Sequence, residues 1–221
     1  MPKGLITSNR PRTLVLATGT GTEIGKTWWG EATLTILRRR GFVVAARKPA
    51  QSGTTWDASD ARRLADACAI SPENVCFPRR TYGAALAPPM AAQFDAQPPF
   101  TIAELVAEST WPPETDIGWL ESAGGVRSPL AIDGDTVDLA RVVMPDITVV
   151  VSNAELGCIN SVRLTADALK GQRLVIALNW YVPDNTLHQL NCDWLTNTDH
   201  FRVVTRPDQL AEEIAQITKR R

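Results

Sequence analysis

A glycine-rich segment near the N-terminus carries residues whose types and spacing suit polyphosphate chemistry. Residues 13–27 read T-L-V-L-A-T-G-T-G-T-E-I-G-K-T, so an apolar, β-favouring run stops at a glycine turn that ends in Gly-Lys-Thr. Successive backbone N–H groups in such a turn form an anion nest, and a following helix points its positive end at the ligand. Lys26 can reach the terminal phosphates, and Thr27 can offer its hydroxyl to Mg²⁺. The segment predicts a strand, a phosphate loop and a helix, against the alternative of an ordinary glycine turn.

The loop is longer than the usual phosphate-loop pattern, which has four residues between its first glycine and Gly-Lys. Here five residues, 20–24, separate Gly19 from Gly25. The Gly-Lys-Thr end keeps its place after an apolar strand. We therefore interpret the segment as a nucleotide site with a lengthened loop.

Three polar residues stand at the expected carboxyl ends of other strands. Lys48, Glu121 and Asn179 each follow or end a short apolar run. Such strand ends project into the crevice where α/β sheets bind ligands. A lysine there supplies positive charge, and a carboxylate can hold Mg²⁺ beside the phosphate loop. The ordinary alternatives are a solvated lysine and a glutamate before a turn. If Lys48 faces the site, Lys48→Ala should abolish activity and largely preserve the fold.

Asp60 adds a second carboxylate, at the start of an expected helix. The alternative is that Ser59 or Asp60 serves only as the helix N-cap. The two histidines and four scattered cysteines are a poor supply for a histidine-centred triad, a zinc site or a disulfide framework. Carboxylates, lysines and Mg²⁺ must therefore carry the chemistry.

The elements that would position these residues alternate between strands and helices. Apolar patterning predicts strands at 14–17, 42–47, 116–121, 146–152, 173–177 and 201–204, and helices at 27–40, 60–69, 101–109, 136–143, 185–195 and 207–219. A further helix runs from the turn at 156–160 to Lys170, and the proline-rich stretch 71–99 yields only a short helix after residue 86. This alternation predicts a three-layer α/β fold with a mostly parallel sheet flanked by helices.

The composition limits the function classes. The 221 residues, 44% of them hydrophobic, suit one domain spanning 1–221. The formal net charge is −1 and no long run of one sign occurs, so we expect neither nucleic acid nor an anionic membrane as a partner. No apolar run reaches the length of a signal-peptide core or a membrane span, so a cytoplasmic location is expected.

Taken together, the motifs resemble those of the dethiobiotin synthase family, which has the P-loop NTPase fold. The resemblance covers most of the chain and rests on six segments in the family's order. They are the long phosphate loop, R-K-P-A-Q-S-G from 47, S-D-A from 59, E-S-A-G-G from 121, L-G-C-I-N from 156 and A-L-N from 177.

The resemblance implies a reaction. Members of this family carboxylate 7,8-diaminononanoate with CO₂ to a carbamate, phosphorylate the carbamate with ATP, and close a ureido ring to give dethiobiotin, ADP and phosphate. It also implies Mg²⁺ as cofactor, ATP as co-substrate, and a homodimer whose active site is shared across the interface.

The resemblance assigns roles to individual residues. Lys26 and Lys48 would be catalytic, and Thr27, Asp60 and Glu121 would bind Mg²⁺. The ATP site would comprise Glu23, Ile24, Gly25, Lys26, Thr27, Trp28, Asp60, Glu121, Gly124 and Asn179, the last reading the adenine edge. Ser52 would contact the carbamate or an amine. Gly157, Cys158 and Asn160 would bind the distant carboxylate of the substrate from the neighbouring subunit.

Some positions depart from the family pattern. Ser122 replaces a glycine after the metal-binding glutamate, Ser161 stands where a histidine often occurs, and Trp28 and Trp29 are bulky for a first helical turn. The stretch after Asp199 matches poorly, which leaves base recognition and nucleotide selectivity open.

Three other functions fit the sequence less well. A nucleotide-switched ATPase usually carries an extra lysine early in the loop, which residues 20–22 lack. A binding protein without turnover would not need two lysines and two carboxylates around one phosphate. An amidoligase would need a glutaminase domain, for which the chain leaves little room.

Overall fold

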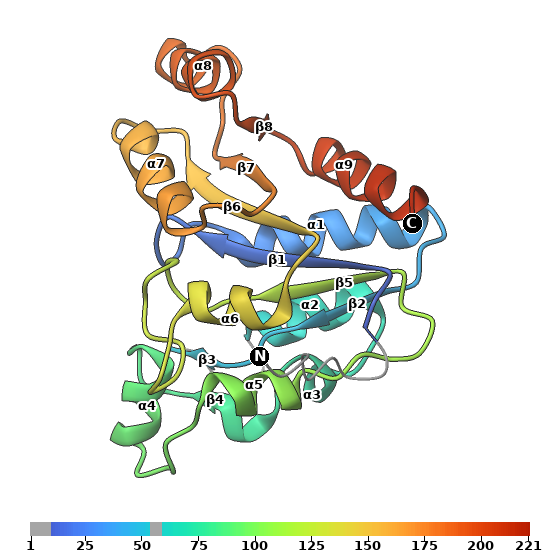
Figure 1. Ribbon diagram of the computed structural model, residues 1–221, viewed down its shortest axis with the longest axis vertical. Helices are drawn as coiled ribbons and strands as arrows, with labels where there is room; N and C mark the ends of the chain where they lie inside the picture. Colours follow the sequence, from blue (N-terminus) through green and yellow to red (C-terminus); the bar gives the residue numbers. More distant parts are fainter. Residues whose placement is uncertain (1–9, 54–58) are drawn as a thin grey trace.

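The computed structural model describes residues 10–53 and 59–221, and it centres on a parallel sheet (Figure 1). The sheet has six strands in the order β2-β5-β1-β6-β7-β8, and all its pairings are parallel. The strands are β1 (Thr13–Gly19), β2 (Val44–Arg47), β5 (Ile117–Glu121), β6 (Ile147–Asn153), β7 (Leu174–Asn179) and β8 (Arg202–Val204). The predicted parallel α/β sheet is therefore confirmed.

Helices cover both faces of this sheet (Figure 1). They are α1 (Lys26–Arg39), α2 (Asp60–Cys68), α3 (Pro72–Val75), α4 (Pro88–Phe94), α5 (Ile102–Glu108), α6 (Thr136–Val143), α7 (Cys158–Ala168), α8 (Thr186–Asp193) and α9 (Pro207–Lys219). Short helical turns, η2 (Pro78–Arg80) and η3 (Trp194–Thr198), complete the set.

Alternation of side chains along the strands explains the three layers. Val15 and Ala17 of β1 pack in a core with α1, α2 and α9, whereas Leu14 and Leu16 of the same strand pack in a second core with α5, α6 and α7. Successive residues of a strand point to opposite faces, and both faces of a parallel sheet are buried. Continuous apolar strands are the expected result.

The stretch 71–99 contains structure that the sequence did not reveal. Two short parallel strands, β3 (Gln51–Ser52) and β4 (Thr81–Tyr82), form a separate two-stranded sheet. Strands of two residues are too short to show an alternating pattern. The pairing matters for the site because it brings the segment after Lys48 next to the residues that precede α4, where the Ser52 hydroxyl donates to the Leu86 carbonyl at 2.6 Å.

Strand register aligns the polar residues that the sequence singled out. Ala17 of β1 pairs with Glu121, and Arg47 of β2 pairs with Leu120, so Lys48 lies level with Glu121 at the same edge. Both lie on the same side of β1, Glu121 on the adjacent strand β5 and Lys48 after the next strand, β2, and the phosphate loop leaves from the end of β1. Within the described residues, no helix is long and apolar enough to cross a membrane.

Candidate nucleotide and phosphoryl-transfer site

The loop between β1 and α1 is held in shape by its glycines. A Cβ at Gly19 would lie 2.6 Å from Ile24 Cγ2, so only glycine lets the loop fold back on the strand. Glu23 and Gly25 have φ of 53° and 92°, in the left-handed region that costs a side chain free energy. Gly25 is the N-cap of α1 and provides no side-chain hydrogen bond to the first turn. The N–H groups of that turn are thus suited to an anionic ligand.

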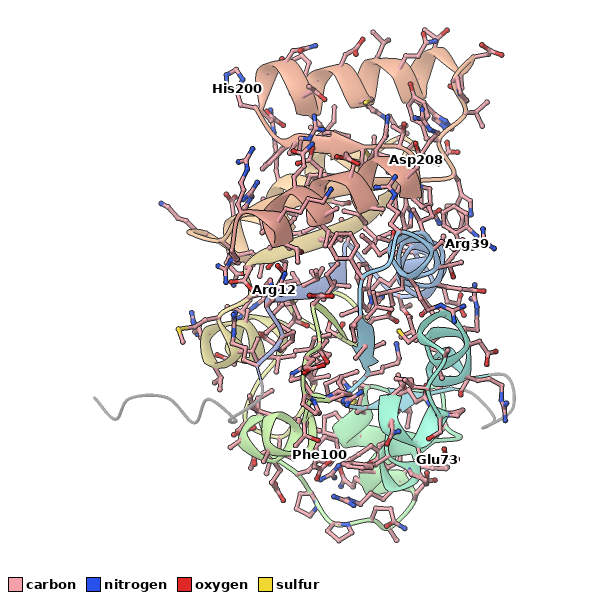
Figure 2. The ribbon with its side chains drawn as sticks, turned by 90° about the vertical axis from the view of Figure 1, so that its right-hand side faces the viewer. Arg12, Arg39, Glu73, Phe100, His200 and Asp208 are labelled. Atoms are coloured by element: carbon pink, nitrogen blue, oxygen red, sulfur yellow. The ribbon has the colours of Figure 1, made fainter. Side chains whose placement is uncertain are left out.

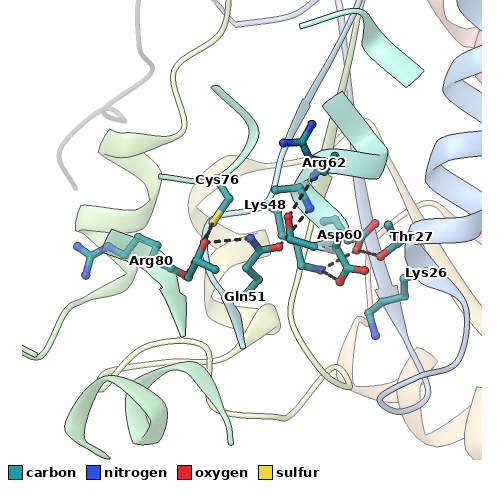
Figure 3. A network of polar contacts seen from close by, with 12 residues as sticks. Lys26, Thr27, Lys48, Gln51, Asp60, Arg62, Cys76 and Arg80 are labelled. Carbon is teal, nitrogen blue, oxygen red and sulfur yellow. Dashed lines mark hydrogen bonds and ion pairs between the residues drawn. The ribbon is translucent and has the colours of Figure 1, made fainter. Parts of the chain in front are cut away.

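A cluster of charged side chains, two of them buried and the third, Asp60, partly exposed, lies beside the loop (Figure 3). Lys48 Nζ lies 2.7 Å from Glu121 Oε1 and 2.9 Å from Asp60 Oδ2, and the Thr27 hydroxyl donates to the same Glu121 oxygen at 2.6 Å. The side chains of Lys48 and Glu121 are 4% and 0% exposed. The predicted strand-end lysine therefore points inward and joins two carboxylates.

Electrostatics favours the charged forms of Lys48 and Asp60. Burial on its own would lower the pKa of Lys48, but Glu121 and Asp60 outweigh it, and the pKa lies above its ordinary value. Burial would raise the pKa of Asp60, yet Lys48 outweighs it and the pKa is lowered. An ammonium paired with carboxylates retains its charge even when its own side chain is buried.

Asp60 is free for this role because its neighbour caps the helix. The Ser59 side chain accepts from Arg62 N at 3.3 Å and is the N-cap of α2. Asp60 begins the helix and directs its carboxylate to Lys48. Of the two interpretations of Asp60, capping thus belongs to Ser59.

Lys26 is poised differently from Lys48. Its ammonium donates to the Gly21 carbonyl at 3.0 Å, inside the loop. Burial, followed by repulsion from Lys48, lowers the pKa of Lys26 to about 8. A phosphate would supply the missing negative charge and favour the protonated form.

The donor set fits a hard divalent cation that also binds phosphate. Thr27, Asp60 and Glu121 present only oxygen atoms. Asp60 and Glu121 contact Lys48 Nζ, and the Thr27 hydroxyl donates to the same Glu121 oxygen. Among the described residues no group of three or more His, Cys, Asp or Glu side chains could hold a metal alone. Mg²⁺ commonly takes one or two carboxylates and completes its shell with water and substrate phosphates.

A cavity of about 720 Å³ opens over these groups. Its lining includes the predicted residues Glu23, Ile24, Gly25, Lys26, Thr27, Trp28, Lys48, Ser52, Asp60 and Gly124. Glu121 is fully buried and reaches the cavity through its contacts with Thr27 and Lys48. This volume suits a ligand of nucleotide size.

A second cavity, of about 500 Å³, adjoins the first. Gly25, Trp28 and Arg63 line both, and the second continues to Trp29, Leu178, Asn179, Trp180, Tyr181 and Thr205. The Asn179 amide donates to the Ile24 carbonyl at 3.0 Å, so this residue stabilises the phosphate loop as well as lining the cavity. The role predicted for Asn179 was base recognition alone.

The turn that begins α7 lines neither cavity. Gly157 has φ of 92°, and Gly157 and Asn160 are exposed. The Cys158 side chain is 1% exposed and packs in the core, so a ligand contact at this residue could come only from its backbone. Within one chain, the described structure does not bring this turn to the phosphate loop.

Several lining residues escaped prediction. Gln51 accepts from Ala61 N at 3.1 Å and donates to Thr81 Oγ1 at 2.9 Å, which ties the start of α2 to β4. Ser128 accepts from Gly125 N at 3.0 Å and holds the glycine turn after Glu121. Their sequence signals are ordinary polar residues in loops. Trp180 could have been predicted from its position, because it directly follows Asn179 at the end of β7.

The two histidines take no part in lining either cavity. His188 is buried and accepts from Val182 N at 3.0 Å, while His200 lies at the periphery of the molecule (Figure 2). The prediction that carboxylates and lysines form the site agrees with this placement.

Comparison with known proteins gives consistent matches. A family profile described as AAA domain matches residues 12–206. An ATP-dependent dethiobiotin synthetase BioD of Chromohalobacter salexigens is 35% identical over 75% of this chain and 72% of that protein. Proteins of the same name from Pseudomonas aeruginosa and Xanthomonas campestris are each 34% identical and are matched over 72% of their length.

Solved structures match the fold at low sequence identity. A plasmid partition protein of Borrelia burgdorferi bound to AMPPNP has a TM-score of 0.57 and 13% identity, covering 96% of this chain and 99% of that one. The signal recognition particle receptor FtsY of Elizabethkingia anophelis has a TM-score of 0.53 and 12% identity, covering 98% of this chain and 68% of that one. These structures share the parallel three-layer architecture with this chain.

Proposed function

This chain belongs to the ATP-dependent dethiobiotin synthetase family, and from that premise we propose how its own residues perform the reaction. The enzyme is a ligase of biotin biosynthesis that forms dethiobiotin with ATP. The observation that carries the mechanism is the position of Lys48, whose ammonium contacts Glu121 and Asp60 next to the phosphate loop.

The proposed reaction has three balanced steps. One amine of 7,8-diaminononanoate adds to CO₂ and loses a proton, giving a carbamate. A carbamate oxygen attacks the γ-phosphorus of ATP, and ADP leaves. The second amine then attacks the carbamoyl carbon and loses a proton, the ureido ring closes, and phosphate departs with that carbamate oxygen.

The two lysines would stabilise the charge that moves during phosphoryl transfer. Lys26 leaves the first turn of α1 and reaches into the loop, where an anionic phosphate would raise its lowered pKa and favour the ammonium form. Lys48 directly follows β2 and contacts Glu121, which also accepts from the Thr27 hydroxyl. Fixed cations on two sides of the transferred group act without reorganisation, which is the main source of catalysis in such reactions.

Mg²⁺, held by Thr27, Asp60 and Glu121 together with phosphate oxygens, would neutralise charge on ATP. The Lys48 ammonium, held beside the same two carboxylates, would stabilise negative charge on the carbamate. Ser52, which lines the same cavity and donates its hydroxyl hydrogen to the Leu86 carbonyl, would accept from an N–H of the carbamate or of an amine.

We further propose a homodimer in which the turn at 157–160 binds the substrate's carboxylate in the neighbouring subunit. Two observations support it. The turn lines neither cavity of its own chain, and Leu156 and Leu164, at 87% and 63% exposure, place apolar surface beside it. Exposed apolar patches often mark interfaces. We assign the whole chain to one catalytic domain that works in the cytoplasm.

The test is product formation by the purified protein. Incubation with diaminononanoate, ATP, Mg²⁺ and carbon-labelled bicarbonate should give labelled dethiobiotin, detected by mass spectrometry, with one ADP per product. ATP hydrolysis that ignores the diamine, with no ureido product, would instead indicate a nucleotide switch and sink the proposal.

An oxygen label tests the order of steps. With CO₂ labelled in both oxygens, the phosphate released should carry one labelled oxygen, because a carbamate oxygen bonds to phosphorus. Unlabelled phosphate beside labelled dethiobiotin would rule out phosphorylation of the carbamate.

A further inference from the structure

The second cavity, beside the phosphate loop, is lined by large aromatic side chains. Trp28, in the first turn of α1, and Trp180, the residue after β7, both line it, and Tyr181 lies next to Trp180. The two indoles are 46% and 58% exposed. Large aromatic side chains gain most from burial, so two of them half open to one cavity indicate a surface that a ligand covers.

Backbone strain supports a functional role for Trp180. Its φ is 55°, in the left-handed region that bulky residues rarely occupy. Such conformations cost free energy and concentrate at ligand sites. The strain turns the chain at the end of β7 directly after Asn179, which holds the phosphate loop through Ile24.

Trp28 is oriented before any ligand arrives. Its ring meets Trp29 edge to face, with centroids 5.7 Å apart and planes at 86°, and Trp29 is fully buried. The buried ring restricts the rotamers of its neighbour. Trp28 also lines the larger cavity, so it lies where the two cavities join.

Three polar groups that border this cavity are already paired within the chain. The Asn179 NH₂ donates to the Ile24 carbonyl, and Arg63 pairs with Glu31 at 2.7 Å. Thr205 N donates to Gln209 Oε1 at 2.9 Å. Discrimination among bases depends on hydrogen-bond partners aimed at their edges, whereas every base has a face that can stack.

We propose that Trp28 and Trp180 form a stacking subsite for the nucleobase, and that this subsite makes the enzyme weakly selective among nucleoside triphosphates. The inference rests on the proposed function for the identity of the ligand. Purines gain more than pyrimidines because their rings cover more of the indole faces. The phosphate loop holds the triphosphate alike for every base.

The test compares ligands with and without a base on the complete protein. Replacing either tryptophan, Trp28→Ala or Trp180→Ala, should weaken ATP binding about 5- to 100-fold, the effect of removing one stacking face. Affinity for inorganic triphosphate should stay within about twofold. Calorimetry measures both ligands, and Trp28→Phe should restore most of the loss.

Trp194→Ala is the matched control. That indole is 47% exposed, contacts Arg163 and lines neither cavity, so its removal should leave ATP affinity unchanged. The wild-type protein should bind ATP and GTP within about tenfold of each other and CTP more weakly. Circular dichroism confirms that each variant is folded.

Two results would overturn the inference. One is an equal loss of ATP and triphosphate affinity in both tryptophan variants, and the other is a preference of more than a hundredfold for ATP over GTP. These outcomes are separate from the proposed function, since a protein that made no dethiobiotin could still show base-dependent binding. Conversely, dethiobiotin formation with unchanged ATP affinity in both variants would contradict the stacking subsite alone.

Discussion

The two ends of the nucleotide site are built on different physical principles. At the phosphate end, Lys48 and Glu121 are almost completely buried and are joined at 2.7 Å. At the other end, Trp28 and Trp180 are about half exposed. Moving charge requires fixed, dehydrated partners, because a buried ion without a partner is costly. A neutral nucleobase needs only apolar side-chain faces on which to stack.

This difference predicts that the phosphate end is intolerant of change and controls the rate, whereas the base end is tolerant and controls affinity. The predictions below test that contrast, starting with the largest expected effect.

Removing the Lys48 ammonium should be the most damaging change. Lys48→Ala leaves Glu121 buried without its cation, so we expect a loss of product formation of at least about a hundredfold and a fall in the free energy of unfolding of about 3–5 kcal/mol. Dethiobiotin assays and urea denaturation in EDTA measure these effects. The sequence alone predicted loss of activity with the fold largely preserved; the pairing now adds a stability penalty.

Two controls accompany this variant. Lys219→Ala, at an exposed position in α9, should change neither quantity. The double change Lys48→Met with Glu121→Gln should recover part of the lost stability, because the fully buried charge at Glu121 is then removed together with its cation, and Asp60, at 43% side-chain exposure, remains hydrated. Full stability in Lys48→Ala would show that the cluster is less tightly coupled than its geometry indicates.

Gly25→Ala tests the junction between the two ends. The new Cβ would lie 2.1 Å from Asn179 Nδ2, and φ there is 92°. We expect weaker ATP binding and a loss of about 1–3 kcal/mol in stability. Gly41→Ala is matched, since its φ is 89° but nothing lies within 4 Å. Equal losses in the two variants would mean that backbone strain alone, and not the contact with Asn179, limits this position.

Asn160→Ala addresses the turn outside both cavities. If the turn serves a neighbouring subunit, the KM for the diamine should rise about tenfold, the loss of one hydrogen bond to a charged group, with the KM for ATP unchanged. Steady-state kinetics at several protein concentrations would also reveal dependence on a dimer. Parallel changes in both KM values would argue that the turn has no special contact with the diamine.

The smallest expected effect is on thiol reactivity. Cys68 and Cys76 pack in the core that contains α1 and α2 residues. Burial raises the pKa of Cys68 to about 12 and of Cys76 to about 11. At pH 8 these thiols are protonated and enclosed, so the less buried Cys192 should react first with a thiol reagent, without loss of activity. Raising the pH increases the thiolate fraction and should speed labelling. Rapid labelling of Cys68 or Cys76 at pH 8 would mean that this core opens readily.

The sequence revealed the phosphate end because its signals are local. Gly25, Lys26 and Thr27 are contiguous, and Lys48 and Glu121 mark the ends of apolar strands that a parallel sheet brings to one edge. Strand order and the pairing of Lys48 with both carboxylates depend on tertiary structure and could not be predicted from spacing.

The base end was less predictable for a physical reason. Trp180 matters through a left-handed backbone conformation, and Asn179 through its bond to Ile24, which is 155 positions away. The short β3 and β4 strands likewise have no periodic pattern. Features that arise from one conformation or one long-range contact leave little trace in a local sequence.

The most direct test measures the rate of labelled dethiobiotin formation against ATP concentration for the wild-type protein, Lys48→Ala and Trp180→Ala. We predict that Lys48→Ala forms almost no product even at saturating ATP, whereas Trp180→Ala reaches the wild-type rate but needs about 5- to 100-fold more ATP to do so. A wild-type rate in Lys48→Ala, or a reduced saturating rate in Trp180→Ala with no change in the ATP requirement, would contradict the division of the site into a catalytic end and an affinity end.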